Sequence, residues 1–550
     1  MHATPLLQIR NVDIEFSTSR GPVSAVRNFS LTLEAGRKVA VVGESGSGKS
    51  TIAAAINGLL ADNGRVSKGE ILFQGRDVTR MSEAELRDLR GQNVGLVPQD
   101  PMTNLNPLQR VGDTIAEVLS VHGKASGKAA LERAIQLLDM VGIPDPARRA
   151  RQYPHELSGG MRQRVLIAAG LACEPALLLA DEPTSALDVT VQAIILRELE
   201  KLTSKLGTAM ILITHDLGLA ADYADDVVVM FRGDVVETGA ARDVLRNPQH
   251  DYTRRLIAAA PTLESQPLVA ARPASGTDQE RPLVELRNLR KIYGDTKSLF
   301  GKDKSFVAVA DSSLTIGRGE TVSIVGESGS GKSSTARMLL KIEKPTSGEI
   351  IFDGAPITHL EGRDLFSVRR RMQPVFQNPF GSLDARYTIR ESIEEPMILH
   401  KIGDAVFRAA RVKELLEQVA LSQDIANRRP AEISGGQSQR VAIARALALK
   451  PELIVLDEAV SALDVIVQAQ VLELLVELQR ELGLSYLFIS HNLAVVRLIS
   501  HIVHVMKRGE IVESGDPERI FNAPQHPYTQ QLVAAVPGQS TFEEVGPYLA

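Results

Sequence analysis

The chain has 550 residues, of which 44% are hydrophobic and 23% charged, so it has room for about two to four globular domains. Its 62 lysines and arginines stand against 67 aspartates and glutamates, and the net charge of −5 excludes a strongly basic nucleic-acid-binding protein. The single cysteine, Cys173, excludes an internal disulfide framework and a four-cysteine metal or iron–sulfur site, and its apolar neighbours predict an inert buried thiol.

The hydropathy pattern predicts no membrane span. The first residues, Met-His-Ala-Thr-Pro, lack the basic segment and the apolar stretch of a secretory signal. No run of 18 apolar residues occurs, and the longest candidate, Val165 to Cys173, ends at Glu174 and Pro175. We therefore expect that the chain does not cross a membrane by itself.

Near the N-terminus, alternating apolar residues predict strands, and the pattern returns after residue 282. The residues are Leu7 and Ile9, then Val12, Ile14 and Phe16, and in the second half Val284 and Leu286, then Leu289 and Ile292.

A glycine-rich octapeptide, Gly43-Glu-Ser-Gly-Ser-Gly-Lys-Ser50, comes next and recurs as Gly326 to Ser333. It lies between an apolar run over 38–42, which predicts a buried strand, and a helix predicted over 50–60. In this pattern the glycines let backbone N–H groups cradle phosphate oxygens at a helix N-terminus, the lysine reaches the terminal phosphates, and the serine can bind Mg²⁺. Two glycine-rich turns without a nucleotide are the alternative, which the repetition in context disfavours.

Two helices are predicted further along the first half, over 113–122 and 128–141. In the second of them one face carries Leu131, Ala134, Ile135, Leu138 and Val141. Strands and helices alternate on both sides of this pair. The expected fold class is therefore α/β, with a small helical subdomain set between two parts of a strand–helix core.

A Ser-Gly-Gly tripeptide precedes a predicted helix in each half, in Leu157-Ser-Gly-Gly-Met161 and Ile433-Ser-Gly-Gly-Gln437. The helices are predicted over 162–172 and 438–448. Small residues at a helix N-terminus can bind an anion, although Ser-Gly-Gly alone is only a capping signal.

Two apolar strands end in adjacent acids, Asp181-Glu182 and Asp457-Glu458. Beside a phosphate loop, the aspartates can complete a Mg²⁺ shell and the glutamates can polarise the water that attacks the γ-phosphate. Solvated acids at a strand end are the alternative, which two copies after two phosphate loops disfavour. His215 and His491 each stand at the end of a predicted apolar strand, directly after 210–214 and 486–490. This position favours them as site residues.

The order of these motifs indicates a duplication. The offset between copies is 283 at the phosphate loop (326 − 43) and 276 at the Ser-Gly-Gly serine (434 − 158). The second copy thus has seven extra residues before its phosphate loop (283 − 276), which we expect within 294–305. We predict a first domain over 1–260, a proline-containing linker over 261–282, a second domain over 283–540 and a tail over 541–550.

Together these motifs resemble the ATP-binding-cassette (ABC) ATPases, twice and over nearly the whole chain. In that family the signature of one cassette closes over the nucleotide of the other. The resemblance implies that Lys49, Glu182 and His215 work opposite Ser434 to Gln437. It implies likewise that Lys332, Glu458 and His491 work opposite Ser158 to Met161. Ser185 to Asp188 and Ser461 to Asp464 match the loop that communicates between the sites. Since both copies keep every principal motif, two hydrolysing sites are expected.

The resemblance implies ATP and Mg²⁺ as cofactors and assigns the site residues as follows. The catalytic residues are Glu182, Glu458, His215 and His491. The Mg²⁺ ligands are Ser50, Gln99, Asp181, Ser333, Gln377 and Asp457, and the two glutamines also touch the transport partner. The ATP-binding residues are Gly43, Glu44, Ser45, Gly46, Ser47, Gly48, Lys49, Ser50, Thr51, Gln99, Ser158, Gly159 and Gly160 in the first copy, and Gly326, Glu327, Ser328, Gly329, Ser330, Gly331, Lys332, Ser333, Ser334, Gln377, Ser434, Gly435, Gly436 and Gln437 in the second. Phe16 and Tyr293 are the candidates for stacking on adenine, and Phe16 fits the strand core equally well.

The second copy departs mildly from the family pattern. It has Glu458-Ala-Val-Ser where the first has Glu182-Pro-Thr-Ser, Ser438 where an arginine is usual, and Asn492 where Asp216 follows the histidine. None of these removes a ligand or the base, but equal turnover at the two sites does not follow.

The segments Asn247-Pro-Gln-His-Asp-Tyr-Thr253 and Ala523-Pro-Gln-His-Pro-Tyr-Thr529 resemble a segment of dipeptide, oligopeptide and nickel importers. We interpret the residues themselves as a turn fixed against the cassette without ligand contact. As a marker they indicate the fused two-cassette ATPases of peptide uptake, including the glutathione-importer type. The resemblance implies two separate permease subunits, an external solute-binding protein, a position on the cytoplasmic face of the inner membrane, and no nucleic-acid partner.

Three alternatives remain at this point. A tandem cassette acting on ribosomes also lacks membrane spans, but its cassettes are joined by a long charged helical linker. An exporter motor is disfavoured by the importer segments. An importer motor for a non-peptide solute, such as nickel or opines, keeps the same machinery.

Overall fold

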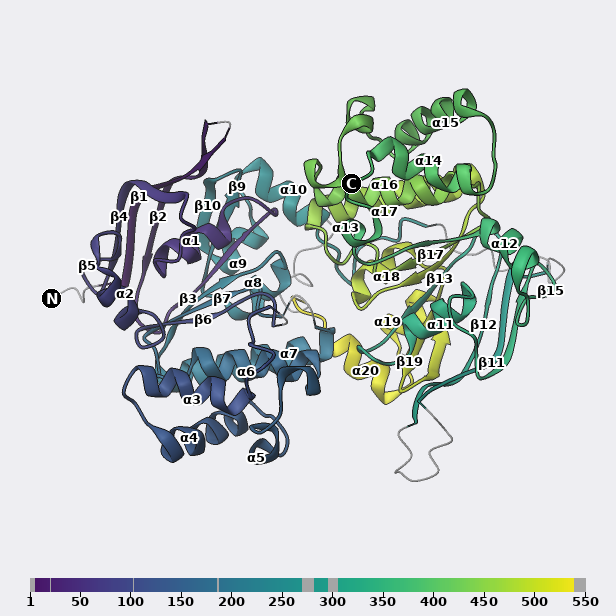
Figure 1. Ribbon diagram of the computed structural model, residues 1–550. Helices are drawn as coiled ribbons and strands as arrows, with labels where there is room; N and C mark the ends of the chain where they lie inside the picture. The colour runs from purple at the N-terminus through teal and green to yellow at the C-terminus, as the bar shows by residue number, and fades with distance from the viewer. Residues whose placement is uncertain are drawn as a thin grey trace. The chain divides into compact units, whose positions relative to one another are not determined.

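The computed structural model describes residues 5–19, 21–101, 103–184, 187–269, 281–294 and 305–538. These residues form two compact units (Figure 1). The first unit holds the described residues up to Ala260 together with Pro537 and Gly538, and the second holds the described residues of 261–536. Among the described residues, no helix is both long and apolar enough to cross a bilayer.

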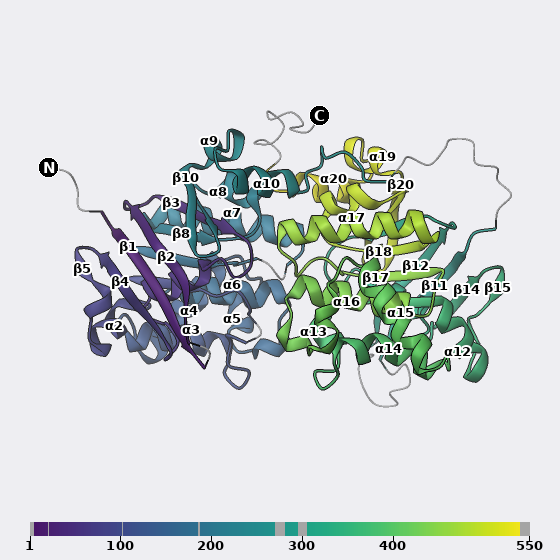
Figure 2. The ribbon, with the colours of Figure 1, turned by 90° about the horizontal axis from the view of Figure 1, so that it is seen from above.

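In the first unit ten strands form one sheet in the order β5-β4-β1-β2-β10-β9-β3-β8-β7-β6. Strands β5, β4, β1 and β2 pair antiparallel, whereas β9, β3, β8, β7 and β6 are parallel neighbours. In Figure 2, β1, β2 and β4 lie beside one another as the antiparallel part. The bounds are β1 Leu7–Thr18, β2 Gly21–Leu33, β3 Lys38–Gly43, β4 Gly64–Phe73, β5 Arg76–Asp77, β6 Val94–Val97, β7 Leu177–Asp181, β8 Ala209–Ile213, β9 Asp226–Phe231 and β10 Asp234–Ala240.

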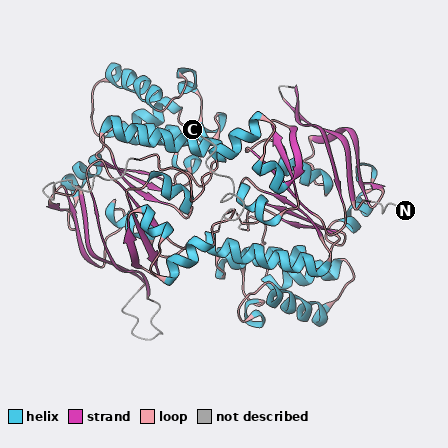
Figure 3. Cartoon of the chain, turned by 180° about the vertical axis from the view of Figure 1, so that it is seen from behind, coloured by secondary structure: helices cyan, strands magenta, loops and turns pink. Residues whose placement is uncertain are grey.

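The helices of the first unit gather on the faces of this sheet and in a separate block beside the strands (Figure 3). Their bounds are α1 Lys49–Ile56, α2 Glu83–Leu89, α3 Val111–Val121, α4 Gly127–Met140, α5 Pro146–Arg149, α6 Gly159–Gly170, α7 Val189–Leu206, α8 Leu217–Tyr223, α9 Ala241–Arg246 and α10 Asp251–Ala259. Helices α3, α4, α6 and α7 share one apolar core with β7 and β8, which confirms the predicted helical subdomain.

The second unit repeats this order, with a sheet β15-β14-β11-β12-β20-β19-β13-β18-β17-β16. Its strands are β11 Val284–Tyr293, β12 Phe306–Ile316, β13 Thr321–Val325, β14 Ser347–Phe352, β15 Ala355–Pro356, β16 Met372–Val375, β17 Leu453–Asp457, β18 Ser485–Ile489, β19 Ile502–Lys507 and β20 Glu510–Gly515. Its helices are α11 Lys332–Leu339, α12 Gly362–Arg371, α13 Pro379–Ser382, α14 Ile389–Leu399, α15 Ala405–Gln418, α16 Gly435–Leu447, α17 Val465–Leu482, α18 Leu493–Ile499, α19 Pro517–Asn522 and α20 Pro527–Ala534.

The buried parallel strands position the site. β3, β8 and β7 are almost entirely buried, as expected for parallel strands covered on both faces, and each is a continuous apolar run. Their carboxyl ends meet at one edge of the sheet, where ligands of open α/β sheets bind. The phosphate loop, the acidic pair and the histidine follow β3, β7 and β8 at this edge. The second unit places its copies after β13, β17 and β18 in the same way.

The two sets of alternating residues near the N-terminus form one strand, β1, and not two. The pairing of β1 with β2 shifts register between Ile9 and Val12. Asn11 in this interval has a φ of 47°. Such a bulge inserts one residue and restores the alternation on the same face, so Ile9 and Val12 are both buried.

Two predicted helical features differ from the structure. The helix after the first phosphate loop, predicted to reach residue 60, ends at Ile56 because Gly58 adopts a left-handed conformation with a φ of 61°. On α4 the buried residues are Ala130, Ala134, Leu137 and Leu138. Leu131 and Ile135, predicted on the buried face of this helix, are only half-buried. The face that packs against the core is rotated slightly from the predicted one.

The domain boundaries differ in detail from those predicted. The start of the predicted linker, 261–269, groups with the second unit, where Leu263 packs against the core and the Leu268 amide donates to the Leu498 carbonyl over 2.8 Å. Pro537 and Gly538, predicted in the second domain, group with the first unit, where the Gly538 amide donates to Asp222 over 2.8 Å. Residues 270–280, most of the predicted extra loop (295–304) and the tail over 541–550 lie outside the described residues.

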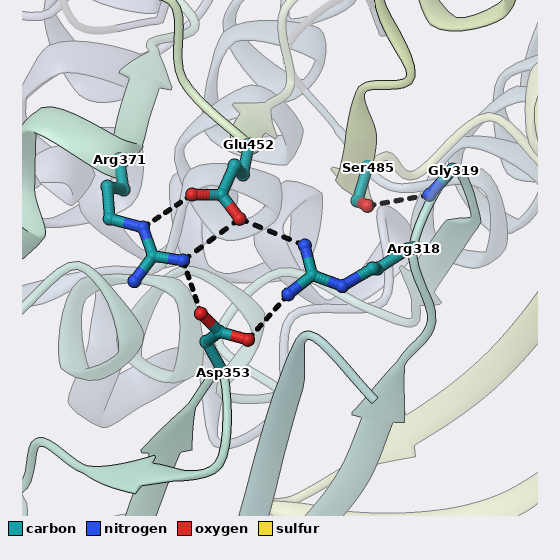
Figure 4. Close-up of polar contacts among 6 residues, drawn as sticks. All are labelled: Arg318, Gly319, Asp353, Arg371, Glu452 and Ser485. Atoms are coloured by element: carbon teal, nitrogen blue, oxygen red, sulfur yellow. Dashed lines mark hydrogen bonds and ion pairs between the residues drawn. The ribbon is translucent and has the colours of Figure 1, made fainter. Parts of the chain in front are cut away.

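A four-residue ion network crosses the second unit at the amino ends of β13 and β17 (Figure 4). Arg318 bridges Asp353 at 2.5 Å and Glu452 at 2.9 Å, and Arg371 bridges the same two carboxylates at 2.6 Å and 2.5 Å. Asp353 lies in the turn after β14, so the network ties the antiparallel part of the sheet to its parallel part. The corresponding residues of the first unit, Ala35, Gln74, Asn93 and Ala176, carry no charge.

Candidate functional site

Each phosphate loop leaves its strand through a turn that only glycine fits. Gly43 has a φ of 148°, and a Cβ there would lie 2.1 Å from the Met230 carbonyl oxygen. A Cβ on Gly48 would lie 2.7 Å from the Ala25 carbonyl oxygen. The corresponding glycines of the second unit, Gly326 and Gly331, meet neighbouring carbonyl oxygens at 2.1 and 2.6 Å. The loop backbone thus packs directly against the sheet, and its N–H groups surround the helix N-terminus.

The lysine of each loop is buried and held by the loop itself. Lys49 Nζ donates to the carbonyl oxygens of Gly43 at 2.8 Å and Glu44 at 2.7 Å. Lys332 makes the matching bonds to Gly326 at 2.7 Å and Glu327 at 2.8 Å. An ammonium held by two carbonyl oxygens beside the backbone N–H groups of the loop fits a phosphate group, and phosphate binding by these residues stays a prediction.

Beside each lysine, a serine and an aspartate offer hard oxygen ligands. Ser50 Oγ lies 3.1 Å from Asp181, and Ser333 Oγ lies 3.1 Å from Asp457. Burial raises the pKa of both aspartates above the ordinary value. A hydroxyl and a carboxylate fit Mg²⁺, which keeps several waters and completes its shell with phosphate oxygens.

Three side chains meet at the glutamate that follows each aspartate. Glu182 accepts a hydrogen bond from Gln99 Nε2 at 2.6 Å, and its other oxygen lies 3.1 Å from His215 Nδ1. In the second unit Glu458 accepts from Gln377 at 2.6 Å, and His491 Nδ1 lies at 3.6 Å. The structure therefore brings together the glutamine, glutamate and histidine that the sequence separates by up to 116 positions (215 − 99).

Both glutamates have a strained backbone. Glu182 has a φ of 44° and Glu458 a φ of 51°, in the left-handed region that non-glycine residues rarely adopt. Their amides donate to the carbonyls of Ile213 and Ile489, both at 2.9 Å, which holds the turn against the neighbouring strand. The equivalent position of both copies thus has the same left-handed conformation, which sets the direction of the glutamate side chain toward the glutamine and the histidine.

The charges at the first site favour the ionised forms of Glu182 and His215. Burial alone would raise the pKa of Glu182, but the bond to His215 and the charges of His215 and Lys49 hold that pKa below its ordinary value. Burial lowers and Glu182 raises the pKa of His215, with a net rise. In the second unit, His491 and Lys332 hold the pKa of Glu458 below its ordinary value against the effect of burial. A carboxylate that stays charged at neutral pH can accept a proton from water.

Comparison with known proteins decides the family. The family model described as ABC transporter matches residues 26–185 and 309–461, more than half of the chain. The chain belongs to the ABC transporter family. The model described as oligopeptide/dipeptide transporter, C-terminal region, matches residues 236–282 and 512–541. Both predictions of the resemblance, two fused ABC cassettes and the peptide-importer subfamily, are therefore confirmed, and the chain is an ATPase of this family.

Two relatives illustrate the similarity. The glutathione import ATP-binding protein GsiA of Salmonella choleraesuis is 46% identical over 557 residues, which cover 97% of this chain and 89% of that protein. The protein of the same name from Escherichia coli strain K12 is 45% identical over 562 residues, covering 98% and 90%. This similarity over the full length favours the importer interpretation over a ribosome-acting tandem cassette.

In each ABC cassette the signature Ser-Gly-Gly begins a helix of the helical subdomain. Ser158 accepts a hydrogen bond from the Met161 amide, and Ser434 accepts one from the Gln437 amide, both at 3.3 Å. A Cβ on Gly160 would lie 2.7 Å from Val191 on α7, and the matching contact of the second cassette would be 2.3 Å from Val467 on α17. The glycine therefore lets two helices approach. The pairing of each signature with the opposite phosphate loop stays a prediction.

The two adenine-stacking candidates lie in different surroundings. The half-buried Phe16 packs against the core of the first cassette, and its ring lies against Gly64. The Tyr293 hydroxyl contacts Glu343 and lies 3.4 Å from Ser334 Oγ, at the start of the helix that follows the second phosphate loop. Stacking on adenine stays a prediction for both residues.

One departure of the second cassette, Asn492, keeps the local structure. Asn492 accepts from the Val495 amide at 3.2 Å and caps α18, as Asp216 caps α8 through the Gly218 and Leu219 amides. The capping bond is retained while the charge beside the histidine is lost. Of the loop that was expected to communicate between the sites, Ser185 and Ala186 lie outside the described residues. Asp188 begins α7 and accepts from the Val191 amide at 3.1 Å.

Sequence reasoning missed one contact to the site. The tyrosines of the two importer segments, Tyr252 and Tyr528, are hydrogen-bonded to the phosphate loops. The available signal was the repetition of a tyrosine at the same offset of 276 (528 − 252) in both cassettes. Cys173 is buried, and burial raises the pKa of its thiol, which agrees with the predicted inert role.

Proposed function

We propose that this chain is the ATP-hydrolysing subunit of an importer for peptides or related small solutes, among which glutathione is the first candidate. The observation that carries the proposal is the coexistence of two ABC cassettes with two importer-type C-terminal segments. Two separate permease subunits would form the membrane path, and an external solute-binding protein would deliver the solute to them. The chain would act at the cytoplasmic face of the membrane, without a nucleic-acid partner.

The residues of each cassette would divide the work of hydrolysis. Lys49 and the loop amides would hold the β- and γ-phosphates, and Ser50 and Asp181 would hold Mg²⁺, which neutralises phosphate charge when bound. Glu182 would take a proton from the attacking water, while Gln99 and His215 orient its carboxylate. The second cassette would use Lys332, Ser333, Asp457, Glu458, Gln377 and His491 in the same roles.

The two cassettes would work as a head-to-tail pair within one chain. Ser434 to Gln437 would complete the site of Lys49, and Ser158 to Met161 would complete the site of Lys332. ATP would favour the closed pair and hydrolysis would reopen it, which gives the permeases two alternating states. The ordered motifs of both copies support this proposal, because each keeps both a nucleotide site and a signature.

Reconstitution tests the transport function. The chain is purified with its permeases and reconstituted into vesicles that contain ATP. The solute-binding protein is added outside the vesicles. We expect uptake of labelled glutathione or a dipeptide, and no uptake with the E182Q/E458Q variant as the matched control. The ligand retained by the purified solute-binding protein, identified by mass spectrometry, then decides the solute, including the nickel or opine alternative. ATP-dependent sedimentation with ribosomes, without permease binding, would contradict the proposal.

A further inference from the structure

The importer segments, Asn247–Thr253 and Ala523–Thr529, each begin a helix on the side of the sheet that carries the phosphate loop. His250 precedes α10, and its Nδ1 accepts a hydrogen bond from the Tyr252 amide at 3.1 Å. His526 precedes α20 and accepts from the Tyr528 amide at the same distance. The histidines thus act as helix caps, and the predicted interpretation as a fixed turn accounts for them.

A glutamate on the strand that comes last in the sequence of each unit, β10 or β20, anchors the segment. The carboxylate of Glu237 on β10 accepts from the amides of Gln249 at 2.7 Å and His250 at 3.0 Å. Glu513 on β20 makes the same two bonds, to Gln525 at 2.8 Å and His526 at 3.0 Å. The segment is therefore held to the sheet by charge-assisted hydrogen bonds at two consecutive amides.

The tyrosine that follows reaches the phosphate loop. Tyr252 is 1% exposed, its ring stacks on Phe231 with centroids 4.2 Å apart, and its hydroxyl accepts from the Glu44 amide at 3.1 Å. Tyr528 is also 1% exposed, and its hydroxyl accepts from the Glu327 amide at 3.0 Å. Lys507 replaces Phe231 and lies over the Tyr528 ring, with Nζ 4.4 Å from its centroid. The hydrogen bond is kept although the ring contact differs.

The amide that donates to each tyrosine belongs to a peptide unit that also holds the lysine of the phosphate loop. The Glu44 N–H and the Gly43 carbonyl are the two polar groups of one planar peptide, and that carbonyl accepts from Lys49 Nζ. A bond to one group fixes the direction of the other. The second cassette repeats the arrangement with Glu327, Gly326 and Lys332.

We propose that Tyr252 and Tyr528 are positioning residues, which orient the first peptide of each phosphate loop and, through it, the lysine that binds the phosphates. The importer segment would then adjust nucleotide binding, in addition to marking the subfamily. This inference rests on the ATPase family of the chain and not on the proposed permeases or solute. It differs from a packing role, because packing requires the ring whereas positioning requires the hydroxyl.

Phenylalanine substitution separates these roles. We expect Y252F and Y528F to bind ATP about three- to tenfold more weakly at the altered site only, because a partly buried amide loses the tyrosine hydroxyl as acceptor while the ring stays in place. Binding of labelled ATP by the full chain is measured by equilibrium dialysis in the E182Q/E458Q background, which prevents turnover. Each single variant should give a biphasic isotherm, and the double variant should be weakened at both sites.

Y486F is the matched control. Tyr486 is fully buried in the second cassette and donates its hydroxyl to the Leu475 carbonyl at 2.8 Å, away from the phosphate loop. This variant should lose stability but keep the ATP affinity. Equal weakening in Y486F and Y528F, or unchanged affinity in Y252F/Y528F with a native circular dichroism spectrum, would overturn the proposal.

Two further readouts report on the loop itself. Amide hydrogen exchange in a peptide containing Glu44 should accelerate in Y252F and stay unchanged in Y486F. In steady-state hydrolysis by Y252F without the E182Q/E458Q changes, KM for ATP should rise by a larger factor than kcat falls. If Y252F fails to fold, E237Q provides the same test, since it weakens the anchor of the segment and should raise KM in the same direction. A normal exchange rate and KM in both variants would contradict the inference.

Discussion

Glu182 and Glu458 each accept a hydrogen bond from a glutamine and face a histidine, and this geometry supports the proposal that they are the catalytic bases. We expect E182Q or E458Q to lower steady-state ATP turnover, and the double variant to lower it at least about 10²-fold, the usual contribution of a general base. The double variant should also retain ATP in a closed form, seen as stable nucleotide co-elution in gel filtration. Unchanged turnover of E182Q/E458Q would exclude both residues as bases.

The pair of Glu182 and His215 predicts a pH dependence of stability. Because the pKa of His215 is raised, its contribution is full below about pH 6.5 and is lost as the pH rises through the folded-state pKa. Because the pKa of Glu182 is lowered, its contribution is present above about pH 4 and is lost in acid. H215A should therefore lower the unfolding midpoint of the first cassette more at pH 6 than at pH 9.

Differential scanning calorimetry measures this effect. The expected difference at pH 6 is about 2–4 °C, which corresponds to about 1 kcal/mol in a unit of this size. H155A, a change at an exposed histidine outside the site, serves as the control. A midpoint change of H215A that is equal at both pH values would show that the imidazole contributes by packing alone.

At the level of elements, the ion network of the second cassette predicts an asymmetry in stability. R371A removes two of its four pairs and should cost about 1–2 kcal/mol, because each partly exposed pair contributes up to about 1 kcal/mol. The pKa values of Asp353 and Glu452 are held low by Arg371 and Arg318, so the stabilisation is present above about pH 4.5 and is lost as the pH falls.

The measurement is the unfolding transition of the second cassette in the full chain at pH 7 and at pH 3.5. The matched control is N93A, at the corresponding position of the first cassette, where no such network exists. R371A should shift the transition more at pH 7 than at pH 3.5, where protonation of the carboxylates has begun to weaken the pairs. An equal shift at pH 3.5 would mean that the arginine stem, and not its charge, stabilises the contact.

Much of the element pattern could be predicted from the sequence, because continuous apolar runs and glycine-rich motifs have few alternative structures. The strands that carry the acids and the histidines lie within one residue of the prediction. The union of two short strands into β1 could not be predicted, because a bulge at Asn11 depends on pairing with distant strands. The ion network was missed for the same reason: Arg318 and Glu452 are 134 positions apart and belong to no motif.

The site residues were predicted as a set, but their contacts were not. Asp181, Glu182, Gln99 and His215 each belong to a short pattern, and the fold places them at one sheet edge. The role of Tyr252 could not be inferred, since a tyrosine in a turn gives no sign of which backbone amide its hydroxyl will meet 208 positions away. Contacts between a side chain and a remote main-chain group leave no pattern in one sequence.

At the level of the whole molecule, the proposed head-to-tail pairing makes the two sites depend on both halves of the chain. S434R, a bulky charge at the second signature, should abolish hydrolysis at the site of Lys49 while leaving ATP binding by the second phosphate loop intact. The test uses E458Q as background, so that only the first site can turn over, and E182Q/S434R for the converse site. Full activity of E458Q/S434R would contradict the pairing.

The left-handed backbone at Glu182 and Glu458 has a consequence for laboratory evolution. Glycine adopts this conformation without the cost of about 1–2 kcal/mol that other residues incur. Selection for heat resistance alone therefore sets relief of this strain against loss of the contacts that the carboxylates make with the glutamine and the histidine. Selection for ATP turnover, in contrast, should retain glutamate at both positions, as the proposed role of the two carboxylates requires.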